Sequence, residues 1–346
     1  MGIFDKLAGW LGTGAPTSTS PGPAAGVRSS LTAGNLVALT VADVFGLDAR
    51  PVSRAEAMAV PAIARARHLL TSDAARCPLE ALNADGTPHA APWLQATSLR
   101  VSPQHRAVWT VDDLIFHGWS LWIASRESDD IADAARVPFS WWRFGEGGTI
   151  LVNDQPVPAG EAILIPGYHE GIIADAPETI RGSRMLEEAW QDRAANPIPA
   201  VELHQTTADT MTPTEVDDLV DNWTASLRAR GGAVGWTPMS IDVRTHGEAA
   251  TDLLIQGRNA AAVDSARIVG VPAAMIDASN VNASLTYETL GGRNLEYVDR
   301  SLALYLGPIE SRLSLDDVCP PGVRVRANTS ALTAATSEPT GHPTGD

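Results

Sequence analysis

Small and apolar residues recur at helical spacing between Ile255 and Val269, and this stretch carries the clearest periodic pattern in the chain. The pattern predicts a helix over residues 250–269 with one apolar stripe. The helix should end at Gly270, because glycine accepts the left-handed conformation of a helix end and Pro272 prevents continuation. Small side chains would let it lie close to a neighbour, as in a packed ring of helices. The apolar positions are Ile255, Ala262, Ala266 and Val269, and the polar ones are Arg258, Asp264 and Arg267.

A polar loop and a second long helix follow this stop. Residues 277–284 consist of Asp, Asn, Ser, Ala and Val, and a helix is predicted from about Leu285 to Leu306. Gly291-Gly292 would kink this helix and Gly307-Pro308 would break it. Its apolar face is predicted at Leu295, Val298, Leu302 and Ile309.

The amino-terminal half alternates between helix and strand signals. Ser53 and Glu56 have capping-box spacing, so a helix should open there, with Pro61 as a start or a kink. A strand at 79–82 and a turn at 83–86 follow. The next helix is predicted over Val111–Ser125, where Gly118 indicates close backbone packing, since glycine is otherwise costly in a helix. Strand and turn signals then predict a β-rich block with strands at 137–144, 149–152 and 161–166.

Residues 197–249 have the pattern of a separate small unit. Thr212 as N-cap and Pro213 at the first helical position predict a helix over Pro213–Arg230. Strand signals flank it at 199–203, 233–236 and 239–244, and Gly231-Gly232 ends it. Its buried side is predicted at Val216, Leu219, Val220, Trp223 and Leu227.

Both ends of the chain have the composition of flexible segments. A short amphipathic stretch at 3–11 precedes a Pro/Gly/Ser/Thr-rich arm at 13–30. The segment 314–346 is predicted to be mostly disordered, because few large apolar residues remain from 331 onward.

The acidic net charge of the chain restricts the kinds of function that it can have. The chain has 346 residues, of which 41 are acidic and 25 basic, for a formal net charge of -16. Proteins that grip DNA need a basic face, because displaced counterions supply much of the affinity. An acidic chain is suited to letting nucleic acid slide past, although acidity also simply aids solubility. No apolar run has the length of a membrane span and no secretory signal is visible, so we expect no membrane partner.

No motif for cofactor chemistry stands out. The eight histidines and the two cysteines, Cys77 and Cys319, lack the spacing of metal ligands, so no cofactor is expected. A P-loop is also missing, so the chain lacks a motor of its own and would depend on a separate ATPase. Asp129, Asp130 and Asp133 form an acidic cluster without the glycine and distal glutamate of a calcium loop. This cluster is either a solvated helix boundary or the site of a soluble metal-dependent hydrolase.

The order of a basic helix, an "IVGVP" stop at 268–272, a polar loop and a long helix resembles the siphovirus-type portal proteins of tailed bacteriophages. Residues 54–181 look like the portal wing, with a "CPLEAL" strand at 77–82, a glycine-containing helix and an "ILIPGY" strand at 163–168. Gly182-Ser183-Arg184 stands where the family has a Gly-x-Ser-Pro helix start, with Arg184 in place of the proline. The resemblance covers about residues 54–313.

The resemblance implies an α+β portal fold whose copies form a ring. It divides the chain into a flexible arm (1–30), an α/β wing (31–181), a first stem helix (182–196), a small α/β clip (197–249), a second stem helix (250–271), a tunnel loop (272–285), a C-terminal wing or crown helix (286–313) and a tail (314–346).

The resemblance also implies a structural, non-enzymatic function. The protein would be a subunit of a ring, usually a dodecamer, at one capsid vertex, where it forms the channel for DNA packaging and ejection. The implied channel-lining residues are Asp252, Gln256, Asp264 and Arg267. The implied tunnel-loop residues are Asp277, Ser279, Asn280, Asn282 and Ser284. The implied docking residues of the clip are Asp217, Asp218, Asp221, Arg228 and Arg230.

The implied partners are other copies of the chain, the large terminase subunit, the head–tail adaptor, the major capsid protein or scaffold, and double-stranded DNA that passes without sequence-specific contact. The implied location is the virion vertex, after assembly in the host cytoplasm. Two alternatives remain: the hydrolase named above, and another head–tail connector component, whose usual small size fits this length less well. A large ring on a sizing column would separate the portal from the hydrolase.

Overall fold

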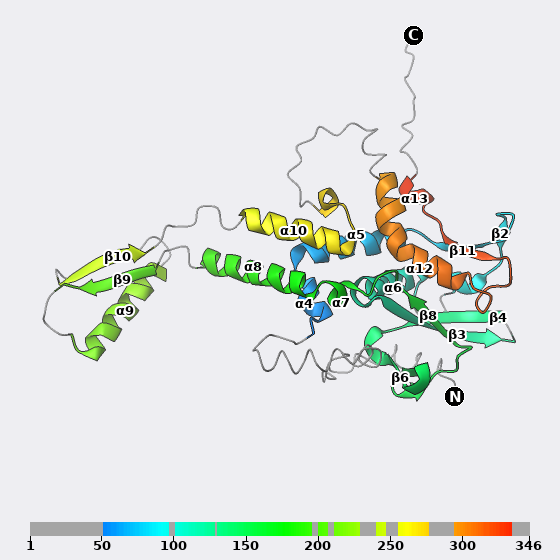
Figure 1. Ribbon diagram of the computed structural model, residues 1–346, viewed down its shortest axis with the longest axis horizontal. Coiled ribbons are helices and arrows are strands. Elements are labelled where there is room, and N and C mark those ends of the chain that lie inside the picture. The colour runs from blue at the N-terminus through cyan, green and yellow to red at the C-terminus, as the bar shows by residue number, and fades with distance from the viewer. Residues whose placement is uncertain are drawn as a thin grey trace, which may run out of the picture. The chain divides into compact units, whose positions relative to one another are not determined.

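The computed structural model describes residues 51–96, 101–128, 130–195, 200–206, 211–228, 240–246, 255–276 and 294–333 (Figure 1). The chain separates into two compact units. The first unit holds the residues before Glu188 and after Gln256, and the second unit holds Glu188–Gln256. Helices and strands are interspersed along the first unit, so the predicted α+β class is confirmed.

Several helices begin where local capping signals stand. At the start of α4, the Ser53 hydroxyl accepts from the Glu56 amide at 3.1 Å, and the Glu56 carboxylate accepts from the Ser53 amide at 2.7 Å, which is the predicted capping box. Ser102 caps α6, with Pro103 in its first turn. The helices are α4 (Arg54–Met58), α5 (Pro61–Ala75), α6 (Pro103–His117), α7 (Ile172–Asp175), α8 (Pro177–Ala195), α9 (Pro213–Arg228), α10 (Ile255–Val269), α12 (Ala303–Leu313) and α13 (Ser330–Thr333), with a π-helical segment η5 (Tyr297–Leu302) directly before α12.

The strands of the first unit form small antiparallel sheets of order β11-β1-β2, β4-β3-β8 and β5-β6-β7. The predicted strand at 79–82 is confirmed, and it pairs with β11 in the register Leu79↔Ala327. The strands are β1 (Leu79–Leu82), β2 (Pro88–His89), β3 (Trp119–Glu127), β4 (Asp130–Val137), β5 (Trp142–Phe144), β6 (Ile150–Val152), β7 (Gln155–Pro156), β8 (Ala162–Pro166) and β11 (Arg324–Ala327).

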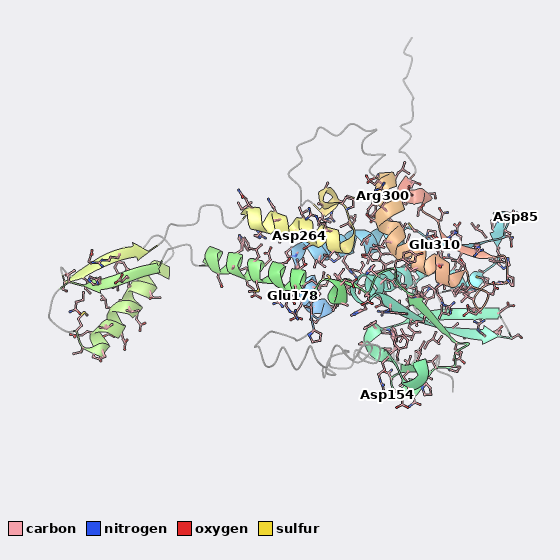
Figure 2. All side chains as sticks on the ribbon, in the orientation of Figure 1. Asp85, Asp154, Glu178, Asp264, Arg300 and Glu310 are labelled. Carbon is pink, nitrogen blue, oxygen red and sulfur yellow. The ribbon has the colours of Figure 1, made fainter. Side chains whose placement is uncertain are left out.

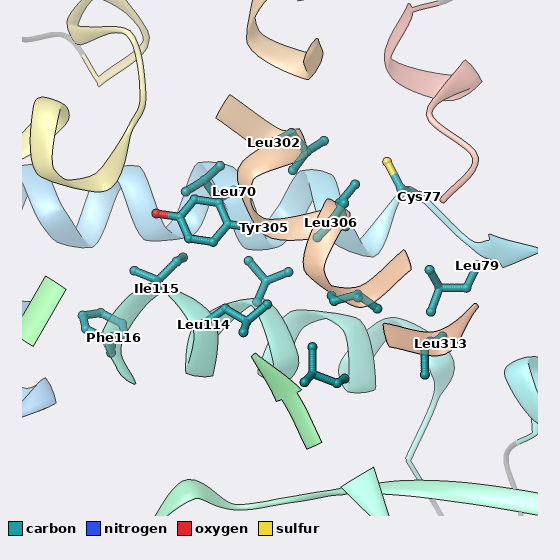
Figure 3. Packing of buried hydrophobic residues seen from close by; sticks show 14 of the residues in the cluster. Leu70, Cys77, Leu79, Leu114, Ile115, Phe116, Leu302, Tyr305, Leu306 and Leu313 are labelled. Atoms are coloured by element: carbon teal, nitrogen blue, oxygen red, sulfur yellow. The ribbon is translucent and has the colours of Figure 1, made fainter. Parts of the chain in front are cut away.

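The main core lies where α5, α6 and α12 pack together (Figure 3). Leu70 of α5, Leu114 and Ile115 of α6, and Tyr305 of α12 are fully buried there. A smaller core, built around Leu121, Ile123, Val137 and Trp142, lies between β3–β4 and the β5–β6 hairpin. Residues of β3 contribute alternately to the two cores, so this strand is covered on both faces.

The predicted helix over 111–125 is correct only as far as His117 and is wrong beyond it. Helix α6 runs from Pro103 to His117 and ends at Gly118, whose φ of 70° is left-handed, and residues 119–127 form β3. Because β3 is buried on both faces, its side chains form a continuous apolar run without the alternation that identifies a strand. Gly118 does mark close packing: an added Cβ would lie 2.5 Å from the Glu170 carbonyl carbon.

Two expectations for the carboxyl-terminal part are also wrong. Gly307-Pro308 does not break the helix, because α12 continues through both residues to Leu313. Burial of Leu306, Pro308, Ile309 and Leu313 offsets the hydrogen bond that proline cannot make. Residues 314–333 are not a disordered tail, since β11 pairs with β1 and Val325 is fully buried.

Two residues assigned to apolar stripes are exposed. Ile255 lies at the start of α10, and Leu295 precedes the π-helical segment. Other residues of the two predicted stripes are buried: Ala266 and Val269 in one, and Val298, Leu302 and Ile309 in the other. Each predicted stripe is therefore wrong only at the helix end that extends beyond the core. Helix α8 begins at Pro177, five residues before the start indicated by Gly182-Ser183-Arg184.

The second unit is a helix with a two-stranded antiparallel sheet. It contains α9, β9 (Ala200–Gln205) and β10 (Ile241–His246), paired in the register Ile241↔Gln205. The predicted helix start is confirmed, since the Thr212 amide donates to the Glu215 carboxylate at 2.9 Å. The predicted buried side is wrong for Val216 and Val220, which are 42% and 48% exposed. A sheet of two described strands is too narrow to cover the whole apolar side of the helix.

Some expectations fall outside the described residues. These are the stretch at 3–11, the arm at 1–30, the glycines at 231–232 and 291–292, and the strand at 233–236. Within the described part, no helix combines the length and the apolar character that crossing a membrane requires.

Candidate functional site: helix α10 and its supports

Helix α10 ends as its sequence predicts. Gly270 has a φ of +74°, and the Val271 amide donates to the Ala266 carbonyl at 3.0 Å, so the helix closes in a left-handed cap. A Cβ added at Gly270 would lie 3.1 Å from the Leu304 side chain of the neighbouring helix. The "IVGVP" stop therefore both ends α10 and allows close contact with α12.

The buried side of α10 is anchored in the main core. Ala266 and Val269 are buried in the cluster that contains Leu302 and Tyr305. The Tyr305 hydroxyl donates to the Val269 carbonyl at 2.7 Å, which satisfies one of the carbonyls at the helix end. The carboxyl end of α10 is thus fixed to α12.

The first turns of α10 lie beside α8 (Figure 1). The Arg258 guanidinium binds both oxygens of Glu187, at 3.0 and 3.2 Å. Leu186 lies 3.6 Å from the place of a Cβ on Gly257, so the glycine brings the two helices close. This contact fixes the antiparallel register of α8 and α10.

The other side of α10 is exposed and polar. Gln256, Asn259 and Arg267 are exposed, and Asp264 binds Arg267 at 2.7 Å across one helical turn (Figure 2). The predicted channel residues Gln256, Asp264 and Arg267 therefore lie outside the core. Because Asp264 offsets Arg267, the described part of this face offers amide groups and a paired charge to anything that passes it.

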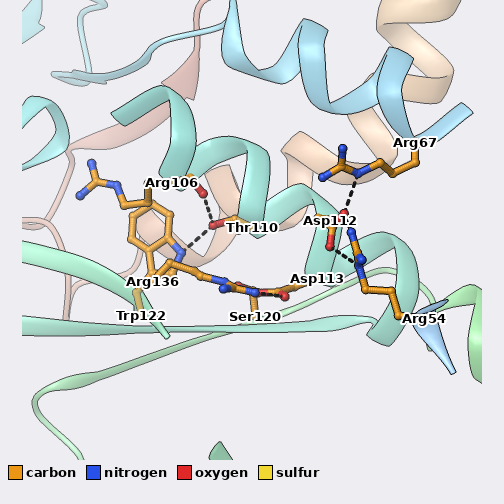
Figure 4. Close-up of polar contacts among 9 residues, drawn as sticks. All are labelled: Arg54, Arg67, Arg106, Thr110, Asp112, Asp113, Ser120, Trp122 and Arg136. Carbon is orange, nitrogen blue, oxygen red and sulfur yellow. Dashed lines mark hydrogen bonds and ion pairs between the residues drawn. The ribbon is translucent and has the colours of Figure 1, made fainter. Parts of the chain in front are cut away.

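A network of charged residues holds α4, α5 and α6 together (Figure 4). Asp112 accepts two hydrogen bonds from Arg54, at 2.8 and 2.9 Å, and one from Arg67 at 2.7 Å. The next residue, Asp113, binds Arg136 of β4 and accepts from Ser120 of β3. Burial raises the pKa of Asp113 to about 6, against the opposing effects of Arg136 and Ser120.

A buried arginine supports the same framework. Arg106 stacks on the Trp122 ring at 4.7 Å and donates to the carbonyls of Trp93 and Ala134. The Trp122 indole donates to Thr110 at 2.8 Å. Burial lowers the pKa of Arg106 to about 10, so it stays charged at neutral pH. Sequence reasoning missed these residues because their partners come from distant segments and form no local motif.

Three glycines form a tight backbone crossing ahead of α8. A Cβ on Gly118 or Gly171 would lie 2.5 Å from backbone atoms of the other segment, and one on Gly167 would lie 2.9 Å from the Gly118 carbonyl oxygen. The Gly167 amide donates to that same oxygen at 2.7 Å. The end of α6 is thereby clamped to the loop that leads through α7 into α8.

The remaining predicted site residues belong to the second unit or lie outside the described residues. Asp217, Asp218 and Asp221 are exposed on α9, in the second unit. Arg228 is the last residue of α9. Asp252, Arg230 and the tunnel-loop residues Asp277, Ser279, Asn280, Asn282 and Ser284 lie outside the described residues.

The acidic cluster gives no metal site in the described part of the chain. Asp130 and Asp133 belong to strand β4, so a helix boundary at this place is wrong, and Asp129 lies outside the described residues. No group of three or more His, Cys, Asp or Glu side chains with ligand geometry occurs among the residues that the structure describes. The hydrolase alternative has no support.

Solved structures match the chain over most of its length. An HK97 family phage portal protein from Corynebacterium diphtheriae is 34% identical, with 83% of this chain and 98% of that chain covered and a TM-score of 0.70. Two structures of gene transfer agent particles share the fold at 14% identity. The match to a chain in the neck of the empty particle covers 82% of this chain and 88% of that chain, with a TM-score of 0.58. The match to a chain in the native virion covers 87% of this chain and 92% of that chain, with a TM-score of 0.56.

Neither the family models nor the curated proteins gave a match. The identity and coverage of the Corynebacterium diphtheriae protein decide to which family the chain belongs. The chain belongs to the HK97 family of phage portal proteins.

Proposed function

We propose that this portal protein forms a closed ring at one vertex of a virion, and that double-stranded DNA passes through the ring during packaging and ejection. The observation that carries the proposal is the 34% identity over 98% of an HK97 family portal protein. The gene transfer agent necks, described with C6 and C12 symmetry, support a ring. The role is structural, and the energy for packaging would come from a separate ATPase.

Helix α10 is the proposed channel wall, with Asp252, Gln256, Asp264 and Arg267 toward the lumen. Its exposed polar side supports this, since a face with paired charges holds DNA phosphates weakly. Residues 277–284 are the proposed tunnel loop. They contain no Lys or Arg, so contact with DNA would be weak and independent of sequence.

The second unit is the proposed clip, which binds the large terminase subunit during packaging and the head–tail adaptor afterwards. Its separation from the rest of the chain and the exposed carboxylates of α9 support this role. The major capsid protein or scaffold would contact the first unit, and assembly would take place in the host cytoplasm before the ring enters the virion.

A direct test is the size and shape of the purified protein. We expect a ring of many subunits by light scattering coupled to size exclusion, with a central channel in negative-stain images. A protein that stays monomeric at micromolar concentration and in the presence of its capsid protein would contradict the proposal.

The tunnel loop has its own test. Replacing Asn280 and Asn282 by Lys in the full chain should tighten contact with DNA and slow packaging or ejection, because each added cation releases a counterion on binding. The matched control replaces them by Gln, which keeps the amide. Lysine variants that cross-link to DNA through the loop but package and eject at the wild-type rate would contradict the assignment.

A further inference from the structure

One face of α8 is exposed in the part of the chain that the structure describes. Glu178, Gly182 and Met185 are spaced four and three residues apart and therefore share a stripe of the helix. The Glu178 side chain is 83% exposed and Met185 is 69% exposed. A Cβ added at Gly182 would meet no described atom within 4 Å, so nothing in the described part of the subunit requires this helix-weakening glycine.

A second face, on α10, has complementary properties. Ala260 is exposed and small, Val263 is half-buried, and the Arg267 side chain is 74% exposed. Ala260 and Arg267 lie on the side of α10 away from Val269, which enters the core, whereas Val263 packs against the edge of that core. The charges of this face, Asp264 and Arg267, bind each other and occur in the same order along the sequence as Glu178 and Arg181 on α8, which also bind each other. Because α8 and α10 are antiparallel, the two pairs point in opposite directions in space.

Residues of opposite charge on α8 and α10 lie at equal distances along the helix axes from the Arg258–Glu187 pair. We call this distance the height of a residue. Arg258 binds Glu187, and from this pair α8 and α10 run in opposite directions along the sequence (Figure 1). Glu178 lies nine residues before Glu187 and Arg267 nine residues after Arg258, so both stand about 13 Å from that pair. Arg181 and Asp264 both stand six residues from it, and Met185 and Ala260 both stand two.

In a closed ring whose axis runs along α8 and α10, rotation about that axis keeps every residue at its own height along these helices. Residues at equal height on α8 and α10 of one copy therefore remain at equal height on neighbouring copies. A head-to-tail ring also needs two different complementary faces, which α8 and α10 provide. We propose that the exposed face of α8 packs against the exposed face of α10 of the next copy. Glu178 then pairs with Arg267 and Arg181 with Asp264 of that copy, while Met185 packs over Ala260.

This inference rests on the proposed ring and names the surface that closes it. The interface explains the glycine at position 182, because α10 of the next copy can come close to α8 where α8 has no side chain. Asp264 and Arg267 then line the channel at the seam between two copies, where the four charges form a neutral cluster. Arg267 is bound there by two carboxylates and is poorly available to DNA phosphates.

Charge-swap variants of the full chain test the pairing. E178R/R181E reverses the two charges of α8 and D264R/R267E reverses those of α10, and both keep the net charge and the pair within each helix. Each swap alone should lower the ring yield about tenfold, since like charges then face each other across every interface. The fourfold variant should restore the yield to within about twofold, because opposite charges face each other again. Thermal unfolding of the monomer fraction controls for folding.

Cysteine cross-linking tests the contact without charge changes. Separately purified M185C and A260C subunits are mixed, assembled and oxidised, so that a disulfide can form only between copies. The native cysteines Cys77 and Cys319 are buried. We expect a covalent dimer that is absent from either variant alone.

The outcomes separate the two proposals. A wild-type protein that forms no ring contradicts the proposed function. If the wild type forms rings, any one of three results overturns the α8–α10 interface and leaves the proposed ring intact. These results are single swap variants with an unchanged ring yield, a fourfold variant that does not recover the yield, and mixed rings in which no disulfide forms.

Discussion

Gly118 shows how much a single residue can determine in this protein. It ends α6 with a φ of +70°, and its missing side chain leaves room for the backbone at Glu170. Replacement by Ala should lower the free energy of unfolding by about 2–4 kcal/mol, since a left-handed alanine costs about 1 kcal/mol and overpacking adds 1–3. Urea denaturation gives the value. Gly86→Ala is the matched control: its φ is +83° but nothing lies within 4 Å of the added carbon, so only the conformational cost should appear.

His117, at the last position of α6, is a pH-sensitive residue of the framework. Its ring stacks on Phe139 at 3.7 Å, and burial lowers its pKa to about 4, with Arg54 and Arg136 acting in the same direction and Asp112 against them. The unfolded chain binds the proton at a higher pH than the folded one, so stability is lost as pH falls from about 6.5 toward 4. The loss should approach about 3 kcal/mol.

The measurement compares urea unfolding of the wild type and of His117→Gln between pH 7 and pH 4. The comparison is needed because Asp113, with its raised pKa, contributes in the opposite sense between its unfolded value and about 6. The variant keeps Asp113 and loses only the histidine. A stability difference between the two proteins that stays constant with pH would contradict the assignment.

At the scale of elements, Asp112 joins α4, α5 and α6 through Arg54 and Arg67. Asp112→Asn should lower the free energy of unfolding by about 3 kcal/mol, because two partly buried guanidinium groups lose their counter-charge. Asp154→Asn removes the partner of Arg143 in an exposed pair and should cost less than about 1 kcal/mol. Equal effects of the two substitutions would show that the network adds nothing beyond a surface pair.

At the scale of the whole molecule, the acidic α9 of the second unit should govern motor docking. D217K/D218K/D221K should weaken binding of the terminase to assembled rings at least about tenfold, since reversed charge repels a basic partner surface. The matched control E127K/E146K/D316K makes the same change in net charge on exposed positions of the first unit. Equal binding by the two triple variants in a pull-down from purified components would move the docking site away from α9.

Much of the local structure could be read from the sequence. The capping residues Ser53 and Thr212, the stop at Gly270 and Pro272, and the strand at 79–82 were predicted and are present. The caps and the stop depend on hydrogen bonds within about four residues or on the conformational limits of one residue type. The strand at 79–82 was found from its local residue pattern, although it pairs with the distant β11. The exposed polar face of α10 was predicted for the same reason, because helical periodicity assigns its sides.

Other features of the fold depend on contacts between distant segments and could not be read from the sequence. Strand β3 was mistaken for helix because two separate cores bury its opposite faces, and α12 passes through Pro308 because the core around it compensates. The partners of Asp112 and Asp113 come from segments that the sequence does not connect, and Val216 and Val220 are exposed because the described sheet beside them is narrow. Local signals in the sequence place the caps of α4 and α9, the stop at Gly270 and the polar face of α10, because these features depend on neighbours within a few residues. Which apolar faces are covered, and by what, is a property of the packed molecule, because burial depends on neighbours that are distant along the chain.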